Sequence, residues 1–276
     1  MTVRTLAHLS DLHLGLDPSF DHAAEALCRT LLALDVDHVI VTGDLTHKGR
    51  HSELARFTRA FEPLIDAGRL SVVPGNHDRV GEDAGRDLLG GSRVVARESD
   101  GVFQVLVDST GDHNRSYFAP HGEICRTVLR KVDALLDAAP EHHLVVIALH
   151  HHPVPMPEET LGERLASSIG LPHARELALG EELVKLAHGR ADLILHGHRH
   201  VPRERSIPGA GPRALSIYNG GASTELQRFR LFSHTEGRVL DPPRWIHAGA
   251  IPARPERAVP QTWARSALRE LSAVFA

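Results

Sequence analysis

The sequence lacks several features that would assign it to a specialised class of protein. Its 276 residues include only two cysteines, Cys28 and Cys125, both in stretches that favour helix, so a disulfide framework is excluded. No apolar run approaches the roughly 18 residues of a membrane span, and the N-terminal residues contain no long apolar core. We therefore expect a cytoplasmic protein that makes no contact with a membrane.

A strong excess of charge is also absent. The 31 Lys and Arg residues against 35 Asp and Glu residues give a formal net charge of −4, whereas a dedicated nucleic-acid binder needs a basic surface for its phosphate contacts. The hydrophobic fraction of 42% is that of a globular domain with a sizeable core. Nucleic acid is therefore a disfavoured partner, and pairing between copies of the chain to form a homo-oligomer stays open.

Short apolar runs alternate with longer amphipathic runs along most of the chain. The apolar runs predict strands over 5–9, 38–42, 70–73, 102–107, 144–149 and 192–195. The amphipathic runs predict helices over 21–34, 52–67, 123–138 and 180–188, and antiparallel strands are expected within 213–232. This alternation predicts an α/β fold, and strands without polar positions indicate sheets that are buried on both faces.

The pattern predicts one main domain over residues 1–240. Within it, the stretch 153–180 is rich in Pro, Glu and Gly and follows a predicted strand directly, so we expect an insert over the active site. Five prolines in 241–260 predict that no regular strand pairing forms there. We interpret 241–276 as a Pro-rich C-terminal extension with a terminal helix over 262–275.

Histidine, by contrast, is abundant, with 21 residues. Groups of Asp, Asn and His follow five predicted strands, namely Asp11 and His13; Asp44; Asn76, His77 and Asp78; His150, His151 and His152; and His198 and His200. Turn preferences explain a single such group, but not five at the same topological position. Because the carboxyl ends of strands in an α/β sheet meet at one edge, we expect these side chains to converge.

The residue types in these groups indicate metal binding. Carboxylate, imidazole and amide ligands without a thiolate suit divalent or trivalent ions such as Mn, Fe or Zn. The candidates are too many for one ion, so two are expected, and Asp44 stands between an upstream pair and a downstream set as the natural bridge. Two ions about 3.5–4 Å apart hold a hydroxide and a phosphoryl oxygen between them, which predicts hydrolysis of phosphate esters.

Taken together, the motifs resemble the calcineurin-like metallophosphoesterase family over residues 5 to about 225. The resemblance rests on Asp11-x-His13, Gly43-Asp44, Gly75-Asn76-His77-Asp78, the His-Pro strand end and Gly197-His198-x-His200. It implies a four-layer α-β-β-α sandwich of two mixed sheets, with a dinuclear metal site at the carboxyl ends of the strands.

The resemblance also implies a role for each residue. The first metal would be held by Asp11, His13, Asp44 and His200, and the second by Asp44, Asn76, His151 and His198. Within the triple histidine, counting back from Pro153 favours His151, with His150 as the runner-up. His77 would protonate the leaving oxygen, as an imidazole can do near neutral pH, and Asp78 would orient it.

The segment 105–109, the Gly122-Glu123 pair and the His-His-Pro end resemble the branch of class III cyclic nucleotide phosphodiesterases and glycerophosphodiesterases. This implies a small-molecule phosphodiester substrate. The alternatives are a DNA or RNA nuclease, since residues 10–15 resemble the opening of the family's repair nucleases, a phosphomonoesterase, and a non-catalytic binding or scaffold relative. Candidates for gripping phosphate through a planar fork are Arg79, Arg115, Arg164 and Arg199.

Overall fold

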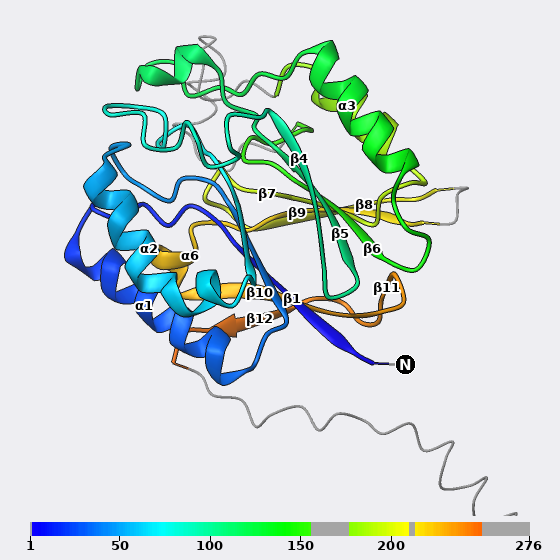
Figure 1. Cartoon of the computed structure of the whole chain (residues 1–276), viewed down its shortest axis with the longest axis horizontal. Coiled ribbons are helices and arrows are strands. Elements are labelled where there is room, and N and C mark those ends of the chain that lie inside the picture. Colours follow the sequence, from blue (N-terminus) through cyan, green and yellow to red (C-terminus); the bar gives the residue numbers. More distant parts are fainter. Residues whose placement is uncertain (1, 156–176, 210–212, 250–276) are drawn as a thin grey trace, which may run out of the picture.

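The computed structural model describes residues 2–155, 177–209 and 213–249. Two sheets face each other, and helices cover their outer faces (Figure 1). The first sheet has the order β11-β10-β1-β2-β3, with β12 also paired to β10. Its strands are β1 (Arg4–Leu9), β2 (His38–Thr42), β3 (Leu70–Val73), β10 (Arg228–Thr235), β11 (Arg238–Val239) and β12 (Arg244–His247).

The second sheet has the order β4-β5-β6-β7-β9-β8. Its strands are β4 (Val94–Ser99), β5 (Val102–Val107), β6 (Leu144–Ala148), β7 (Leu193–His196), β8 (Arg203–Ile207) and β9 (Leu215–Asn219). In both sheets the central strands run parallel, while β10, β4 and β8 pair antiparallel to their neighbours. The sheets are therefore mixed, as the resemblance implied.

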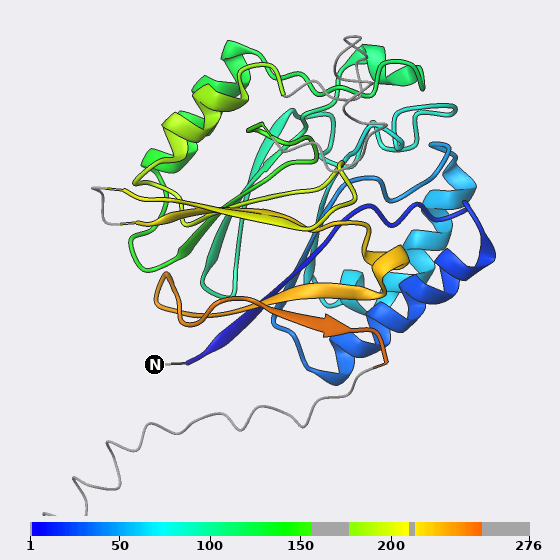
Figure 2. The same cartoon turned by 180° about the vertical axis from the view of Figure 1, so that it is seen from behind.

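The helices complete a four-layer sandwich. Helices α1 (Pro18–Ala33) and α2 (His51–Asp66) cover the first sheet, and α3 (Arg126–Asp137) and α5 (Gly180–Ala187) cover the second, as Figures 1 and 2 show from opposite sides. A 3₁₀ turn (Asp112–Arg115) and the short helix α6 (Ser223–Leu226) lie in the loops. The predicted fold class is confirmed.

The central strands are buried on both faces, which explains why their sequences are continuous apolar runs. In β2, Ile40 faces the second sheet, while Val39 and Val41 face α1 and α2. In β6, Val146 lies between the sheets and Ile147 packs toward α3 and α5. Because side chains alternate along a strand, a strand between two apolar layers has no polar face.

Some elements differ from the sequence prediction. The edge strands β4 and β8 were not predicted, and α3 begins at Arg126 rather than at residue 123. The prediction that the Pro-rich stretch forms no regular pairing is wrong for Arg244–His247, which pairs with β10 from Arg228 to Leu231. Most of the insert, from 156 to 176, and the terminal helix predicted over 262–275 lie outside the described residues.

Candidate metal centre

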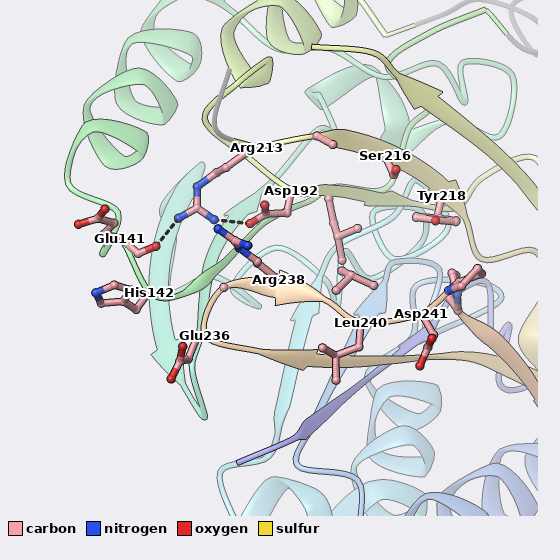
Figure 3. A pocket seen from close by; sticks show the side chains of 16 residues that line it. Glu141, His142, Asp192, Arg213, Ser216, Tyr218, Glu236, Arg238, Leu240 and Asp241 are labelled. Carbon is pink, nitrogen blue, oxygen red and sulfur yellow. Dashed lines mark hydrogen bonds and ion pairs between the residues drawn. The ribbon is translucent and has the colours of Figure 1, made fainter. Parts of the chain in front are cut away.

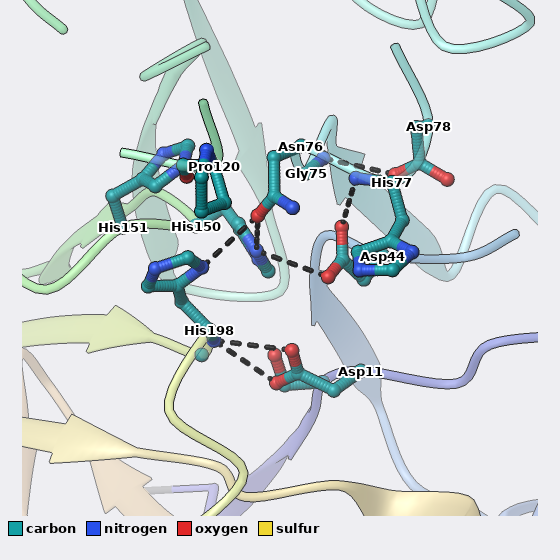
Figure 4. A network of polar contacts seen from close by, with 12 residues as sticks. Asp11, Asp44, Gly75, Asn76, His77, Asp78, Pro120, His150, His151 and His198 are labelled. Atoms are coloured by element: carbon teal, nitrogen blue, oxygen red, sulfur yellow. Dashed lines mark hydrogen bonds and ion pairs between the residues drawn. The ribbon is translucent and has the colours of Figure 1, made fainter. Parts of the chain in front are cut away.

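The loops that follow β1, β2, β3, β6 and β7 bring the predicted groups together at one edge of the two sheets (Figure 4). Asp11, Asp44 and His150 are buried almost completely, whereas the side chain of His200 is exposed by 43%. The predicted convergence of the strand ends is therefore observed, and the site opens to solvent on the side of His200.

One group of four donors consists of Asp11, His13, Asp44 and His200, whose ligand atoms lie within 4.8 Å of one another. The Nε2 atoms of His13 and His200 face each other at 2.9 Å. The Nε2 atom of His200 lies 3.5 Å from Asp11 Oδ1, and that of His13 lies 3.7 Å from Asp44 Oδ2. These four residues are the set that the sequence assigned to the first metal.

A second group lies on the other side of Asp44. The amide oxygen of Asn76 is 3.0 Å from His198 Nδ1 and 3.2 Å from His150 Nε2. His150 Nε2 is also 3.3 Å from Asp44 Oδ2, the same carboxylate oxygen that faces His13. Asp44 therefore stands between the two groups, as a bridging carboxylate would.

The structure brings both His151, the choice made from the sequence, and His150, the runner-up, to this second group, since the ligand atoms of His150, His151 and His198 lie within 4.8 Å of one another. The Nδ1–H of His150 donates to the Thr42 carbonyl at 2.7 Å, which fixes the ring so that Nε2 points at Asp44 and Asn76. Both ring nitrogens of His151 are engaged elsewhere, Nδ1 with the Ser109 hydroxyl at 2.8 Å and Nε2 with the Pro120 carbonyl at 2.9 Å. The Nε2 atom of His150 thus points toward Asp44 and Asn76, whereas the ring nitrogens of His151 face Ser109 and Pro120.

The backbone of the centre is held in an unusual conformation. Five candidate ligands have positive φ angles, namely Asp11 (52°), His13 (46°), Asp44 (50°), His198 (76°) and His200 (53°). Residues with a Cβ rarely adopt this left-handed region, and such strain concentrates at functional sites.

Two motif glycines allow the loops to meet. A Cβ on Gly75 would lie 2.2 Å from Asp44 Oδ1, and one on Gly197 would lie 1.8 Å from the Ser10 hydroxyl. Only glycine permits these approaches, which explains its place in the two motifs.

The electrostatics of the centre fit a bound cation. Burial of Asp11 raises the pKa of its carboxyl group. The ion-pair partners recorded for Asp11 and Asp44 are all histidines. Burial lowers the pKa of His13 and His198 well below the usual range, so their rings are neutral and keep a lone pair for a metal. Buried carboxylates facing neutral imidazoles are a metal-binding donor set, with the N and O ligands that Mn, Fe and Zn accept.

The pKa of His150 moves in the opposite direction. Burial disfavours its charge, but the carboxylates of Asp44 and Asp11 outweigh burial and raise the pKa to about 9. Without a metal, the His150 imidazolium therefore partly neutralises Asp44. A metal at Nε2 has to displace this proton.

Comparison with known proteins agrees with this geometry. The sequence pattern of the calcineurin-like phosphoesterases matches residues 4–202. The chain belongs to this family. All the candidate ligands lie within the matched segment.

Among calcineurin-like phosphoesterases, the chain is similar to proteins named 3',5'-cyclic adenosine monophosphate phosphodiesterase CpdA. It is 28% identical to that of Escherichia coli (strain K12) over 181 residues, which is 60% of this chain and 59% of the relative. It is 29% identical to that of Pseudomonas aeruginosa over 213 residues, 72% of this chain and 71% of the relative. The chain thus spans about three fifths of the E. coli protein's length.

Among solved structures, the chain resembles a dimetal phosphatase from Danio rerio with a TM-score of 0.58. The match covers 90% of this chain and 100% of the other, at 13% sequence identity. At this identity the likeness concerns the fold, which agrees with the sandwich described above.

His77 lies beside the two groups described above and forms a third group of possible metal donors with His13 and His47, whose ligand atoms also lie within 4.8 Å of one another. Its backbone N–H donates to Asp44 Oδ1 at 2.8 Å, and its Nδ1–H donates to the His47 carbonyl at 2.8 Å. Asp78 does not touch the His77 ring; its carboxylate accepts the backbone N–H groups of Thr46 at 2.8 Å and Gly75 at 2.9 Å. The geometry thus differs from the predicted orienting pair: a carbonyl orients His77, and Asp78 ties two metal loops together.

Three residues of the centre were missed from the sequence. His47 stacks on His77 with ring centroids 5.6 Å apart, Ser109 contacts His151, and Tyr117 lies edge-on to His77. Ser109 could have been found, because it follows a predicted strand just as the ligand groups do. Nothing in the local sequence marks the other two, since their place depends on loop geometry.

The arginines considered for phosphate binding lie in different surroundings. Arg79 is only 8% exposed and is held by Asp83 and by the Thr110 hydroxyl at 2.6 Å, so its guanidinium supports the loops. Arg115 is exposed, and Arg199 is half-buried between two candidate ligands. Arg164 lies outside the described residues.

A pocket of about 870 Å³ lies away from the metal centre, between the starts of β7 and β9 and the hairpin of β10 and β11 (Figure 3). Its Arg213 is paired with Asp192 and donates to the Glu141 carbonyl at 2.9 Å. This pocket shares no residue with the ligand groups. No helix among the described residues is long and apolar enough to cross a membrane.

Proposed function

We propose that the protein is a metal-dependent phosphodiesterase that hydrolyses small phosphodiesters, with cyclic nucleotides as the leading class. The observation that carries the proposal is the pair of donor groups that share Asp44, with His77 beside them. The substrate class is supported by the similarity to the CpdA proteins, whose names state a cyclic nucleotide substrate.

In this proposal, Asp11, His13, Asp44 and His200 hold one ion, and Asp44, Asn76, His150 and His198 hold the other. Two bound ions of Mn, Fe or Zn lower the pKa of water and neutralise charge on a phosphoryl group. The Thr42 carbonyl keeps the ring of His150 in its orientation, and the Ser109 hydroxyl holds the ring of the neighbouring His151.

His77 is the proposed general acid. Its Nδ1–H is committed to the His47 carbonyl, so Nε2 carries the proton that is transferred to the leaving alkoxide. Its backbone N–H on Asp44 fixes the distance between this proton and the metal centre. An alkyl diester needs this proton because its alkoxide is a poor leaving group.

The first experiment compares substrates at fixed Mn: 3′,5′-cyclic and 2′,3′-cyclic nucleotides, glycerophosphodiesters, a bis-aryl diester, an aryl monoester and single-stranded DNA. We expect the highest kcat/KM on a small diester. Preferred hydrolysis of DNA or of the monoester would overturn the proposed substrate class, and no hydrolysis with any metal would overturn the proposed activity.

A matched pair of neighbouring variants tests the ligand assignment. His150→Ala should remove one ion per chain by elemental analysis and abolish turnover. His151→Ala removes only an outer contact and should weaken metal affinity by about 10- to 100-fold while full loading is still reached at high metal concentration. The exposed His142 provides the control, because His142→Ala should match the wild type. If His151→Ala lost one ion per chain and His150→Ala only weakened metal affinity, the assignment would be contradicted.

A further inference from the structure

Two consecutive aromatic side chains are exposed, and the first of them lies beside the proposed general acid. Tyr117 is 50% exposed and Phe118 is 87% exposed, the most of any large hydrophobic residue that the structure describes. The ring of Tyr117 lies edge-on to His77, with centroids 6.0 Å apart. The chain is poor in aromatics, at 4%, so two adjacent rings left in solvent at this place require an explanation.

The loop that carries these rings is anchored to the metal centre. The side-chain amide of Asn114 donates to the carbonyls of Ala119 at 2.7 Å and His121 at 3.1 Å. The Pro120 carbonyl accepts from His151 at 2.9 Å, and Gly122 lies so close that a Cβ there would be 2.4 Å from His151 Cγ. Hydrogen bonds to Asn114 and His151 therefore hold the backbone that follows the two rings against the centre.

The proposed reaction indicates which part of the substrate a ring at this position would contact. His77 protonates the leaving oxygen in the proposed reaction, so the alcohol part of the substrate must lie on the His77 side of the phosphorus. A ring beside His77 then meets whatever that alcohol carries. Stacking on a tyrosine or phenylalanine is favourable for a flat base and independent of its hydrogen-bonding pattern, whereas glycerol offers no flat surface.

We propose that Tyr117 and Phe118 form a stacking surface for the nucleobase of a nucleotide substrate. The inference rests on the proposed function and deepens it, because it selects nucleotides over glycerophosphodiesters. It assigns specificity to residues that take no part in metal binding or proton transfer.

The test compares Tyr117→Ala, Phe118→Ala and Tyr117→Phe on 3′,5′-cyclic AMP and on a glycerophosphodiester at fixed Mn. We expect Tyr117→Ala to raise KM for cyclic AMP about tenfold with kcat nearly unchanged, and to change kcat/KM for the glycerophosphodiester less than twofold. Tyr117→Phe keeps the ring and should restore the wild-type KM. Leu240→Ala, another exposed apolar residue at the far pocket, is the control.

Equal losses on both substrates, or unchanged KM values, would overturn the stacking proposal while leaving the phosphodiesterase proposal intact. Hydrolysis of glycerophosphodiesters alone by the wild type would also overturn the stacking proposal and leave the phosphodiesterase proposal intact. Calorimetric binding of AMP to the Mn-loaded protein gives a readout that needs no turnover: Phe118→Ala and Tyr117→Ala should weaken AMP but not inorganic phosphate. A lower melting temperature with equally weak binding of both ligands would show that the rings support the fold instead.

Discussion

The structure predicts that acid destabilises the fold through His38, far from the metal centre. His38 begins β2, is only 2% exposed, and lies among hydroxyl groups: Nε2 is 3.0 Å from Ser71 Oγ and Nδ1 is 2.9 Å from Ser99 Oγ. Burial lowers its pKa to about 4, with Arg97 adding to this effect and Asp100 opposing it. The neutral ring is thus favoured in the folded state.

The sign of the effect follows from the lowered pKa. An unfolded His titrates near 6.5, so the contribution of His38 is fully present above that pH and is lost as the pH falls from about 6.5 to about 4. With these two values, linkage gives a loss of about 2 kcal/mol in the free energy of unfolding between pH 7.5 and pH 5.

Urea unfolding at pH 7.5 and pH 5 measures this loss. The protein is first treated with a chelator, so that pH-dependent metal binding does not contribute to the measured stability. We expect the acid-induced loss of the wild type to exceed that of His38→Gln by about 2 kcal/mol. His142→Gln, an exposed control, should behave as the wild type. The same pH dependence in wild type and His38→Gln would refute the reasoning.

Three further predictions concern the centre. His77→Ala should lower kcat on an alkyl diester by about 100- to 10,000-fold and on an aryl diester far less, and equal losses would contradict its role as general acid. The pKa of His150 is raised to about 9, and a metal bound at its Nε2 atom has to displace the proton, so Mn affinity should rise by up to about tenfold per pH unit from pH 7 to pH 9. Competition titrations measure this affinity, and an affinity that does not change with pH would contradict the prediction. Gly197→Ala places a Cβ against Ser10 and 2.4 Å from Asp11 Oδ2, so we expect loss of metal by elemental analysis; normal metal content at normal stability would argue against the tight contact.

The elements that the sequence predicted correctly have strong periodic signals. The central strands are apolar throughout because helices cover one face and the other sheet covers the second, and this signal needs no tertiary information. The edge strand β8, Arg203–Ile207, is mostly exposed, so it lacks the signal by which strands are recognised. Pairing with β10 likewise overrides the nearby prolines at Arg244–His247.

The choice between His150 and His151 shows where sequence reasoning stops. Counting back from Pro153 assumed that the alternation of a strand continues through the three histidines. β6 ends at Ala148, so His150 and His151 lie beyond the strand, where its alternation does not apply. The orientations of their rings are set by Thr42 and Pro120, which are distant in the sequence.

The loop that carries Asp11 depends on the far end of the domain. The Ser10 N–H donates to the hydroxyl of Ser223, 213 residues later, at 3.0 Å. In the same region β1 pairs antiparallel with β10, and Arg4 lies opposite His234. Because β1 is synthesised before β10, the loop that carries Asp11 is fixed only after β10 has been made. Such non-local pairing slows folding. We therefore expect metal to be retained only after β10 has paired with β1, so truncation within β10 should lower the metal content of the protein.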